Sequence, residues 1–194
     1  MTRRVWDFDR ITPEAGREAV ALLTRRWRPE DLAALPRTDH RYEILDGALL
    51  VTPADSEEHQ SWSAWAHDTL RASAPPGWRV HWNLGIAIED DRLVPDLLVL
   101  SPDAPGAHRT YNPVIPALVV EVESDRTKGV DRTGKHEAYA FAGIRGYWRI
   151  ERTGVLHVHR LRGFEYTAEC VLEPGGSAVL DWPYPVTVTV PEKP

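Results

Sequence analysis

Apolar and polar residues alternate in short runs along most of this chain, a pattern that predicts a domain rich in short strands. Two apolar runs, at 41–45 and 48–52, flank Asp46-Gly47, the strongest short-range signal for a two-residue hairpin. In that hairpin Leu45 pairs with Ala48, and Glu43 therefore pairs with Leu50. The pattern thus predicts a carboxylate on an otherwise apolar strand face.

Helical spacing of apolar residues predicts a helix that Ser56 caps and that runs to about Ser73, where Pro75-Pro76-Gly77 ends it. A second helix is predicted from about Asp131 to Ala142, with Gly143 at its end. Shorter helices are expected at 13–28 and 28–35.

Further strands are expected at 78–88, with a break near Asn83 and Gly85, and at 94–100 and 117–123. Three more, at 146–151, 155–161 and 164–171, form a meander, and 186–190 adds another. The segment 101–116, rich in Pro, Gly, Asn and His, is expected to be a surface loop. The sum predicts a mixed α/β (α+β) domain.

Composition supports a single folded domain over residues 1–194. The chain is 42% hydrophobic with eight tryptophans, and no apolar run approaches the roughly 18 residues of a membrane span. The N-terminus lacks the apolar core of a secretory signal. A single cysteine, Cys170, excludes an internal disulfide and indicates a reducing cytoplasm.

The formal net charge of −6 argues against tight, purely electrostatic binding of nucleic acid. A local basic cluster remains, since Arg126, Lys128, Arg132 and Lys135 lie close together among acidic residues. A mixed-charge, solvated surface is the more common explanation of such a cluster.

Two carboxylates in apolar strands carry the main chemical signal. Asp96 lies in Val94–Leu100 and Glu121 lies in Ala117–Glu123. A buried carboxylate is unfavourable unless it is paired or binds a metal. Asp96 and Glu121 can supply the one or two carboxylates that Mg²⁺ usually takes from a protein, with the carbonyl of Val122 as a further ligand.

Lys135 is the candidate to orient a nucleophilic water or to stabilise negative charge. It follows Asp131 by four residues and precedes Tyr139 by four, so the three share one helix face.

These residues occur in an ordered set that resembles a known family. Tyr42–Gly47, Pro95-Asp96, Val120–Ser124, Asp131…Lys135…Tyr139 and Gly146-Tyr147-Trp148 are similar to the Uma-two (Uma2) family of the restriction-endonuclease-like, PD-(D/E)XK, nuclease superfamily. The similarity extends from about Pro29 to Ile150.

The resemblance implies a restriction-endonuclease-like core at about 29–172, in which helices flank a central mixed sheet with additional antiparallel strands, preceded by a helical extension at 1–28. It implies Mg²⁺ or Mn²⁺ at Asp96 and Glu121, Glu43 as a further acidic site residue, DNA as substrate and a homodimer. The superfamily's usual lysine position is Glu123 here, and Lys135 resembles the migrated lysine of some families.

Other interpretations remain open for each residue. Asp96 can cap a neighbouring backbone, Glu43 can pair with Arg41 or Arg79, and Lys135 can pair with Asp131 on a helix surface. The scaffold can also serve as a non-catalytic nucleic-acid-binding or assembly module. A weaker hypothesis is a histidine-metal hydrolase built on His157 and His159, and His59 is a weak candidate to line the cleft.

Overall fold

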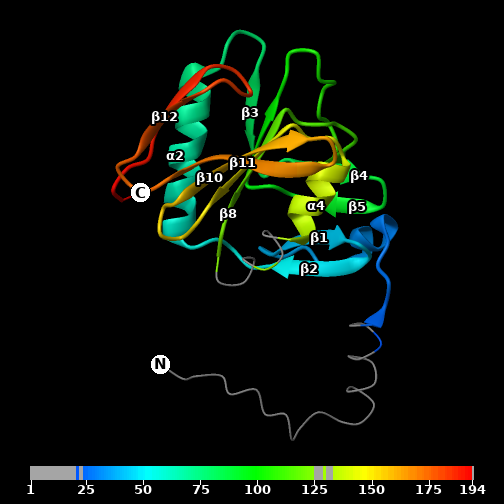
Figure 1. Ribbon diagram of the computed structural model, residues 1–194. Coiled ribbons are helices and arrows are strands. Elements are labelled where there is room, and N and C mark those ends of the chain that lie inside the picture. The colour runs from blue at the N-terminus through cyan, green and yellow to red at the C-terminus, as the bar shows by residue number, and fades with distance from the viewer. Residues whose placement is uncertain (1–20, 22–23, 125–128, 130–132, 194) are drawn as a thin grey trace, which may run out of the picture.

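A mixed six-stranded sheet forms the centre of the molecule (Figure 1). The computed structural model describes residues 21, 24–124, 129 and 133–193. The strand order is β11-β10-β9-β8-β6-β3, and only β8 and β9 are parallel. The strands are β3 (Arg79–Trp82), β6 (Leu97–Leu100), β8 (Leu118–Val122), β9 (Gly146–Ile150), β10 (Leu156–Arg162) and β11 (Glu165–Leu172).

Two smaller sheets accompany it. A five-stranded sheet has the order β2-β1-β5-β4-β7, and a hairpin joins β12 to β13. Their strands are β1 (Arg41–Leu45), β2 (Ala48–Thr52), β4 (Gly85–Ile88), β5 (Asp91–Leu93), β7 (Tyr111–Asn112), β12 (Ser177–Leu180) and β13 (Val186–Thr189). Strands β1 and β2 lie below the central sheet in Figure 1.

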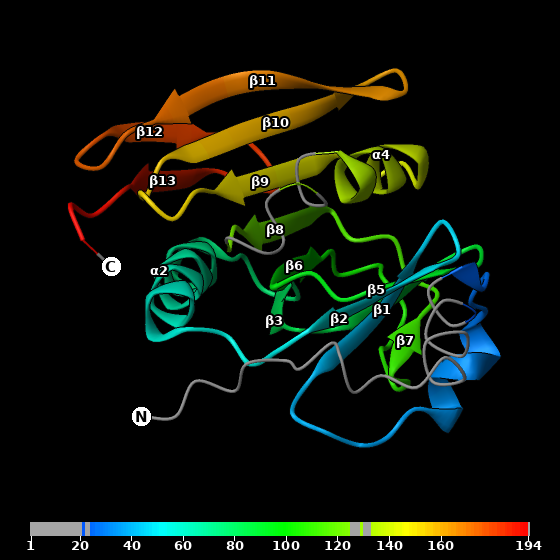
Figure 2. The same cartoon turned by 90° about the horizontal axis from the view of Figure 1, so that it is seen from below.

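Two helices, α2 (Glu57–Ser73) and α4 (Gly134–Phe141), pack on opposite faces of the central sheet (Figure 2), and a short 3-10 helix, η2 (Pro29–Ala34), precedes β1. Ser56 caps α2 by accepting a hydrogen bond from the His59 amide, as predicted. Gly143 follows α4 with a φ of 75°, the left-handed conformation that glycine adopts without strain. None of the helices in the described part of the chain is both long and apolar enough to cross a membrane.

Successive residues of β6 and β8 contribute to two different cores, because side chains alternate across a strand. Leu97, Leu118 and Val120 pack with α2 and the β12–β13 hairpin. Leu98 and Val119 pack with α4, β4 and β5 on the opposite face. The central sheet therefore has an α2 face and an α4 face, and both are buried.

Most of the predicted elements are confirmed, including the hairpin register Glu43↔Leu50, the break at Asn83 and the meander. Several details differ. The strand expected at 94–100 begins at Leu97, so Asp96 lies just before it, and the helix expected at 28–35 is a 3-10 helix. Three short strands were not predicted: β5, β12, and β7, which lies within the loop expected at 101–116. The proposed helical extension at 1–28 lies largely outside the described residues, as does Asp131.

Candidate active site

The carboxylates predicted from sequence meet at one end of the central sheet. The antiparallel register pairs Leu97 with Val120, so one residue further along Asp96 stands opposite Glu121. The amide of Val122 donates to Asp96 Oδ2 at 2.8 Å, which ties the start of β6 to the end of β8. Asp96 is 3% exposed and Glu121 is 1% exposed.

Lys135 joins Glu43 to Glu121. Its Nζ lies 3.0 Å from Glu43 Oε1 and 3.1 Å from Glu121 Oε1, and all three side chains are buried. Glu43 also accepts a 2.7 Å hydrogen bond from the Val94 amide. The structure therefore brings Glu43, Glu121 and Lys135 into direct contact, although they come from β1, β8 and α4.

Gly134 allows α4 to approach β1 this closely. A Cβ added at Gly134 would lie 2.7 Å from Leu45 Cδ2, closer than carbon atoms pack. Glycine weakens a helix by about 1 kcal/mol relative to alanine. Here it lets the first turn of α4 rest on β1, and the next residue, Lys135, reaches Glu43.

Tyr139 lies one helical turn after Lys135 on the same helix face, as their spacing predicted. Both side chains contact Glu121. Its hydroxyl donates to Glu121 Oε1 at 2.6 Å. Burial and the nearby Glu121 charge raise the pKa of Tyr139 well above its ordinary value, so the phenol keeps its proton. From the sequence, Tyr139 was part of a helix face and of the family resemblance, but it was not among the candidate catalytic residues.

Arg41 is a further site residue that was considered only as a partner of Glu43. Its Nη1 lies 2.9 Å from Asp96 Oδ1, and its Nε lies 3.7 Å from Glu43 Oε2. Burial by itself raises the pKa of Asp96, but the hydrogen bond with His59 and the charge of Arg41 outweigh it and hold that pKa below its ordinary value. Asp96 is therefore ionised at neutral pH.

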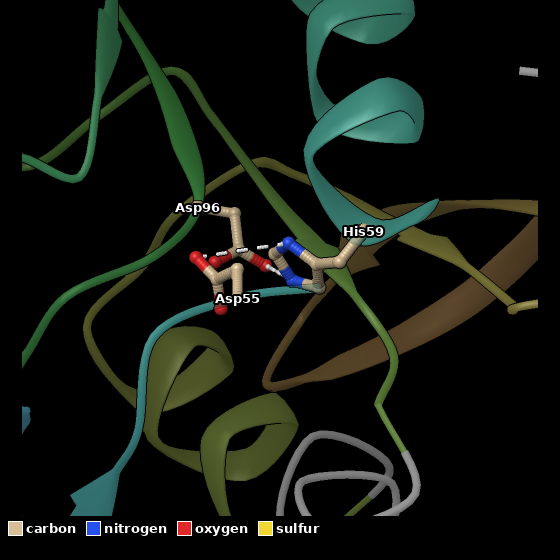
Figure 3. A group of neighbouring side chains, drawn as sticks. All are labelled: Asp55, His59 and Asp96. Carbon is tan, nitrogen blue, oxygen red and sulfur yellow. Dashed lines mark hydrogen bonds and ion pairs between the residues drawn. The ribbon is translucent and has the colours of Figure 1, made fainter. Parts of the chain in front are cut away.

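His59 approaches Asp96 from the start of α2 (Figure 3). Its Nε2 lies 3.2 Å from Asp96 Oδ2, and its Nδ1 lies 3.8 Å from Asp55 Oδ2. Burial lowers the pKa of His59, but the hydrogen bond with Asp96 and the charges of Asp96 and Asp55 together outweigh burial, so the pKa is raised. The sequence carried a weak signal for the contact between Asp55 and His59, since these residues are four apart where a helix begins.

Glu123, at the position of the superfamily's usual lysine, faces a guanidinium. It contacts Arg149 Nη1, which also lies 3.2 Å from Glu151 Oε1. Arg149 stands beside Glu121 in the parallel β8–β9 register. Arg149 on the neighbouring strand β9 therefore places a guanidinium group beside Glu123, the position at which the superfamily usually has a lysine.

His157 and His159 do not form a metal site with any third described ligand. His157 Nε2 lies 2.9 Å from Glu151 Oε1, and the His159 ring packs against Tyr147. Among the described residues, the only His, Cys, Asp and Glu group with the spacing of metal ligands is Asp55, His59 and Asp96. The hypothesis of a hydrolase centred on His157 and His159 is not supported by this geometry.

The charges at the site suit a divalent cation. Among the described side chains, three buried carboxylates (Glu43, Asp96 and Glu121) outnumber the lysine and arginine side chains that contact them, Arg41 and Lys135. Two carboxylates on neighbouring strands are the protein ligands that Mg²⁺ commonly takes. An ion bound by Asp96 would share that carboxylate with Arg41.

Comparison with known proteins agrees with this arrangement. The profile of the Uma2 family, described as a putative restriction endonuclease, matches residues 29–189. The chain belongs to the Uma2 family. None of the curated proteins matches it significantly.

A solved structure shares the fold of this Uma2 protein. It is a putative nuclease belonging to DUF820 from Anabaena variabilis, with a TM-score of 0.66 and 18% sequence identity. The similarity covers 80% of this chain and 89% of the other. The fold is therefore restriction-endonuclease-like, as the resemblance implied.

Proposed function

We propose that this Uma2 protein is a metal-dependent nuclease that hydrolyses phosphodiester bonds in DNA. The observation that carries the proposal is the convergence of Glu43, Asp96 and Glu121 with Lys135 at one end of the central sheet. Buried ion clusters contribute little to stability compared with apolar packing of the same volume. A functional role explains why four ionisable side chains occupy this interior.

Asp96 and Glu121, with the carbonyl of Val122, would hold Mg²⁺ or Mn²⁺. The ion would neutralise charge on the phosphate and lower the pKa of a bound water. Asp96 is suited to this role because its pKa is depressed, so protons do not compete for its oxygens at neutral pH.

Lys135 would hold a water or stabilise developing negative charge on the phosphate. Its ammonium group is positioned by Glu43 and Glu121, which restrict it to one location. Tyr139 donates to Glu121 and orients that carboxylate. Arg41 places a second permanent positive charge beside Asp96, where it can also meet a phosphate.

A cavity of about 600 Å³ opens beside this end of the sheet, and its lining includes His59, Val122, Glu123 and Arg152. It is large enough to admit a nucleotide-sized group next to Val122. The description of the Uma2 family as a putative restriction endonuclease supports DNA as the substrate. The homodimer stays a prediction.

The test is DNA cleavage by the purified full-length protein in Mg²⁺ or Mn²⁺, with Asp96→Asn and Glu121→Gln as variants. Removal of either ligand is expected to reduce the rate at least about a hundredfold, and excess chelator is expected to abolish it. Single-stranded DNA, duplex DNA and RNA are assayed in parallel to define the substrate class.

Matched control substitutions at exposed sites, Asp103→Asn and Glu165→Gln, are expected to cleave at the wild-type rate. Circular dichroism and unfolding curves identify any variant that fails to fold. Wild-type cleavage by folded Asp96→Asn and Glu121→Gln, or cleavage in chelator, would refute the proposal.

A non-catalytic binding or assembly module is the second candidate. The contacts of Arg41 with Asp96 and of Arg149 with Glu123 favour it, because they neutralise site carboxylates without an ion. Calorimetry separates the two candidates. A folded protein that binds neither Mg²⁺ nor Mn²⁺ and cleaves no nucleic acid would support the module.

A further inference from the structure

A second cavity adjoins Asp96 on the side away from Lys135. Its volume is about 490 Å³, and its lining includes Asp55, His59, Ser63, Trp82, Asn83 and Asp96. The proposed nuclease mechanism uses only Asp96 from this set. The cavity therefore contains ionisable groups whose role is not explained by the Glu43–Glu121–Lys135 cluster.

Asp55, His59 and Asp96 have the spacing of metal ligands. One ligand atom from each lies within 4.8 Å of the others (Figure 3). Bonds of about 2.1 Å place neighbouring ligands of an octahedral ion about 3 Å apart and opposite ligands about 4.2 Å apart. His59 Nε2 and Asp96 Oδ2, at 3.2 Å, are therefore at the separation of neighbouring ligands.

Ser63 provides an independent indication that this cavity holds a ligand. Its side chain is 4% exposed, and its Oγ has no hydrogen-bond partner among the described residues. Ser63 lies one helical turn after His59 and lines the same cavity. A buried hydroxyl without a partner is unfavourable, and a water bound to a metal ion would supply the missing partner.

We infer that Asp55, His59 and Asp96 form a second metal site, which takes a divalent transition ion such as Mn²⁺ or Co²⁺ in preference to Mg²⁺. The imidazole nitrogen is the reason for that preference, because Mg²⁺ favours oxygen ligands whereas nitrogen suits transition metals. An ion here would take the place of the hydrogen bond between His59 Nε2 and Asp96 Oδ2.

This inference deepens the proposed function, since both sites use Asp96. The two sites differ in their other ligands, however. Glu121 belongs to the site facing Lys135, and Asp55 and His59 belong to the cavity on the side of α2. Substitutions of these residues therefore test the two sites separately.

The experiment is titration of the full-length protein with Co²⁺ and with Mg²⁺ by calorimetry, together with NMR signals of the histidine rings. The wild-type protein is expected to bind Co²⁺ at least about tenfold more tightly than Mg²⁺. Co²⁺, which is paramagnetic, is expected to shift or broaden the ring signals of His59.

His59→Ala and Asp55→Asn are each expected to lower the Co²⁺ affinity at least about tenfold. Glu121→Gln is expected to retain the His59-dependent Co²⁺ binding, and the exposed control His108→Ala is expected to bind like the wild type. Wild-type Co²⁺ affinity in either His59→Ala or Asp55→Asn overturns the inference. Unchanged His59 signals in saturating Co²⁺ also overturn it.

The outcomes distinguish this inference from the proposed function. Co²⁺ binding that depends on His59, without cleavage of any nucleic acid, would contradict the nuclease proposal alone. Mg²⁺-dependent cleavage without such Co²⁺ binding would contradict only the second site.

Discussion

The two faces of the central sheet are both buried, but they are stabilised in different ways. On the α2 face, Leu118 and Val120 of β8 pack among apolar side chains. On the α4 face of the same strand, Val119 is followed by Glu121, which contacts Lys135 and Tyr139. Neighbouring residues of β8 therefore have different roles: Val120 packs among apolar side chains on the α2 face, and Glu121 joins a cluster of charged and polar side chains on the α4 face.

The difference shows where stability and function separate in this molecule. Apolar burial contributes about 25 cal/mol per Å² without requiring a partner of defined chemistry. Each charge on the α4 face requires several specific partners from distant elements. We therefore expect a substitution of an apolar residue on the α2 face to weaken the fold whether or not metal is present, and a substitution in the charged cluster on the α4 face to have an effect that depends on metal.

The largest expected effect is that of Lys135→Met on the metal-free protein. Loss of the ammonium leaves Glu43 and Glu121 buried side by side, and breaking such a cluster typically lowers the free energy of unfolding by about 3–5 kcal/mol. Bound Mg²⁺ should restore part of this loss, because it offsets the carboxylate charge and binds only the folded state.

Urea unfolding of Lys135→Met with and without Mg²⁺ measures both quantities. The deficit relative to the wild type should be smaller in Mg²⁺. An equal deficit under the two conditions would contradict the assignment of a metal to these carboxylates.

Leu118→Ala tests the α2 face of the same strand. Leu118 is fully buried, and its truncation should lower the free energy of unfolding by about 2–5 kcal/mol through lost burial and a cavity. The loss should be the same with and without Mg²⁺, and the folded variant should keep the metal affinity of the wild type. A metal-dependent loss would show that the two faces are not independent.

Tyr139→Phe removes one hydrogen bond from the charged face and leaves the aromatic packing. The expected loss of unfolding free energy is about 1.5–3 kcal/mol, the range for hydrogen bonds to charged groups. Thermal or urea unfolding measures it, and Tyr166→Phe, which removes a hydrogen bond to the neutral carbonyl of Ile144, provides the matched comparison. A loss no larger than in Tyr166→Phe would argue that the charge of Glu121 adds nothing to the hydrogen bond.

His159→Gln should produce the smallest effect, one that appears only as a pH dependence. Burial and the neighbouring His136 lower the pKa of His159 to about 4. The unfolded chain therefore binds this proton more readily, and the wild type should lose stability as the pH falls from about 6.5 to about 4.

Because the ring is partly exposed, water screens the effect to below about 1 kcal/mol. Unfolding curves across this pH range should have a shallower slope for His159→Gln than for the wild type. The exposed control His108→Gln should keep the wild-type slope, and an identical slope in all three proteins would rule out the contribution of His159.

Much of the fold could be predicted because its signals are local. The turn at Asp46-Gly47, the Ser56 cap and the glycine after α4 each depend on a few neighbouring residues. The prediction failed for β12, whose residues Ser177–Leu180 form a strand by pairing with β13. Strand β6 begins at Leu97, whereas the sequence predicted a strand from Val94. Asp96, just before β6, contacts Arg41 and His59.

The candidate site was predictable as a set of residues but not as a set of contacts. Glu43, Asp96, Glu121 and Lys135 were identified from apolar surroundings, spacing and resemblance. The partners Arg41 and His59 were raised only as alternatives, and Arg149 was not considered. Arg41 and Asp96 are 55 residues apart, and no local pattern reveals which cation reaches a buried carboxylate.

The amino-acid sequence by itself determined most of the strands and helices, the hairpin register and the carboxylates that must be buried, since these follow from side-chain alternation and backbone preferences. Only the tertiary structure decided which charges meet. The cluster depends on how closely β1, α2 and α4 approach the end of the central sheet, and that distance is set by packing over the whole domain.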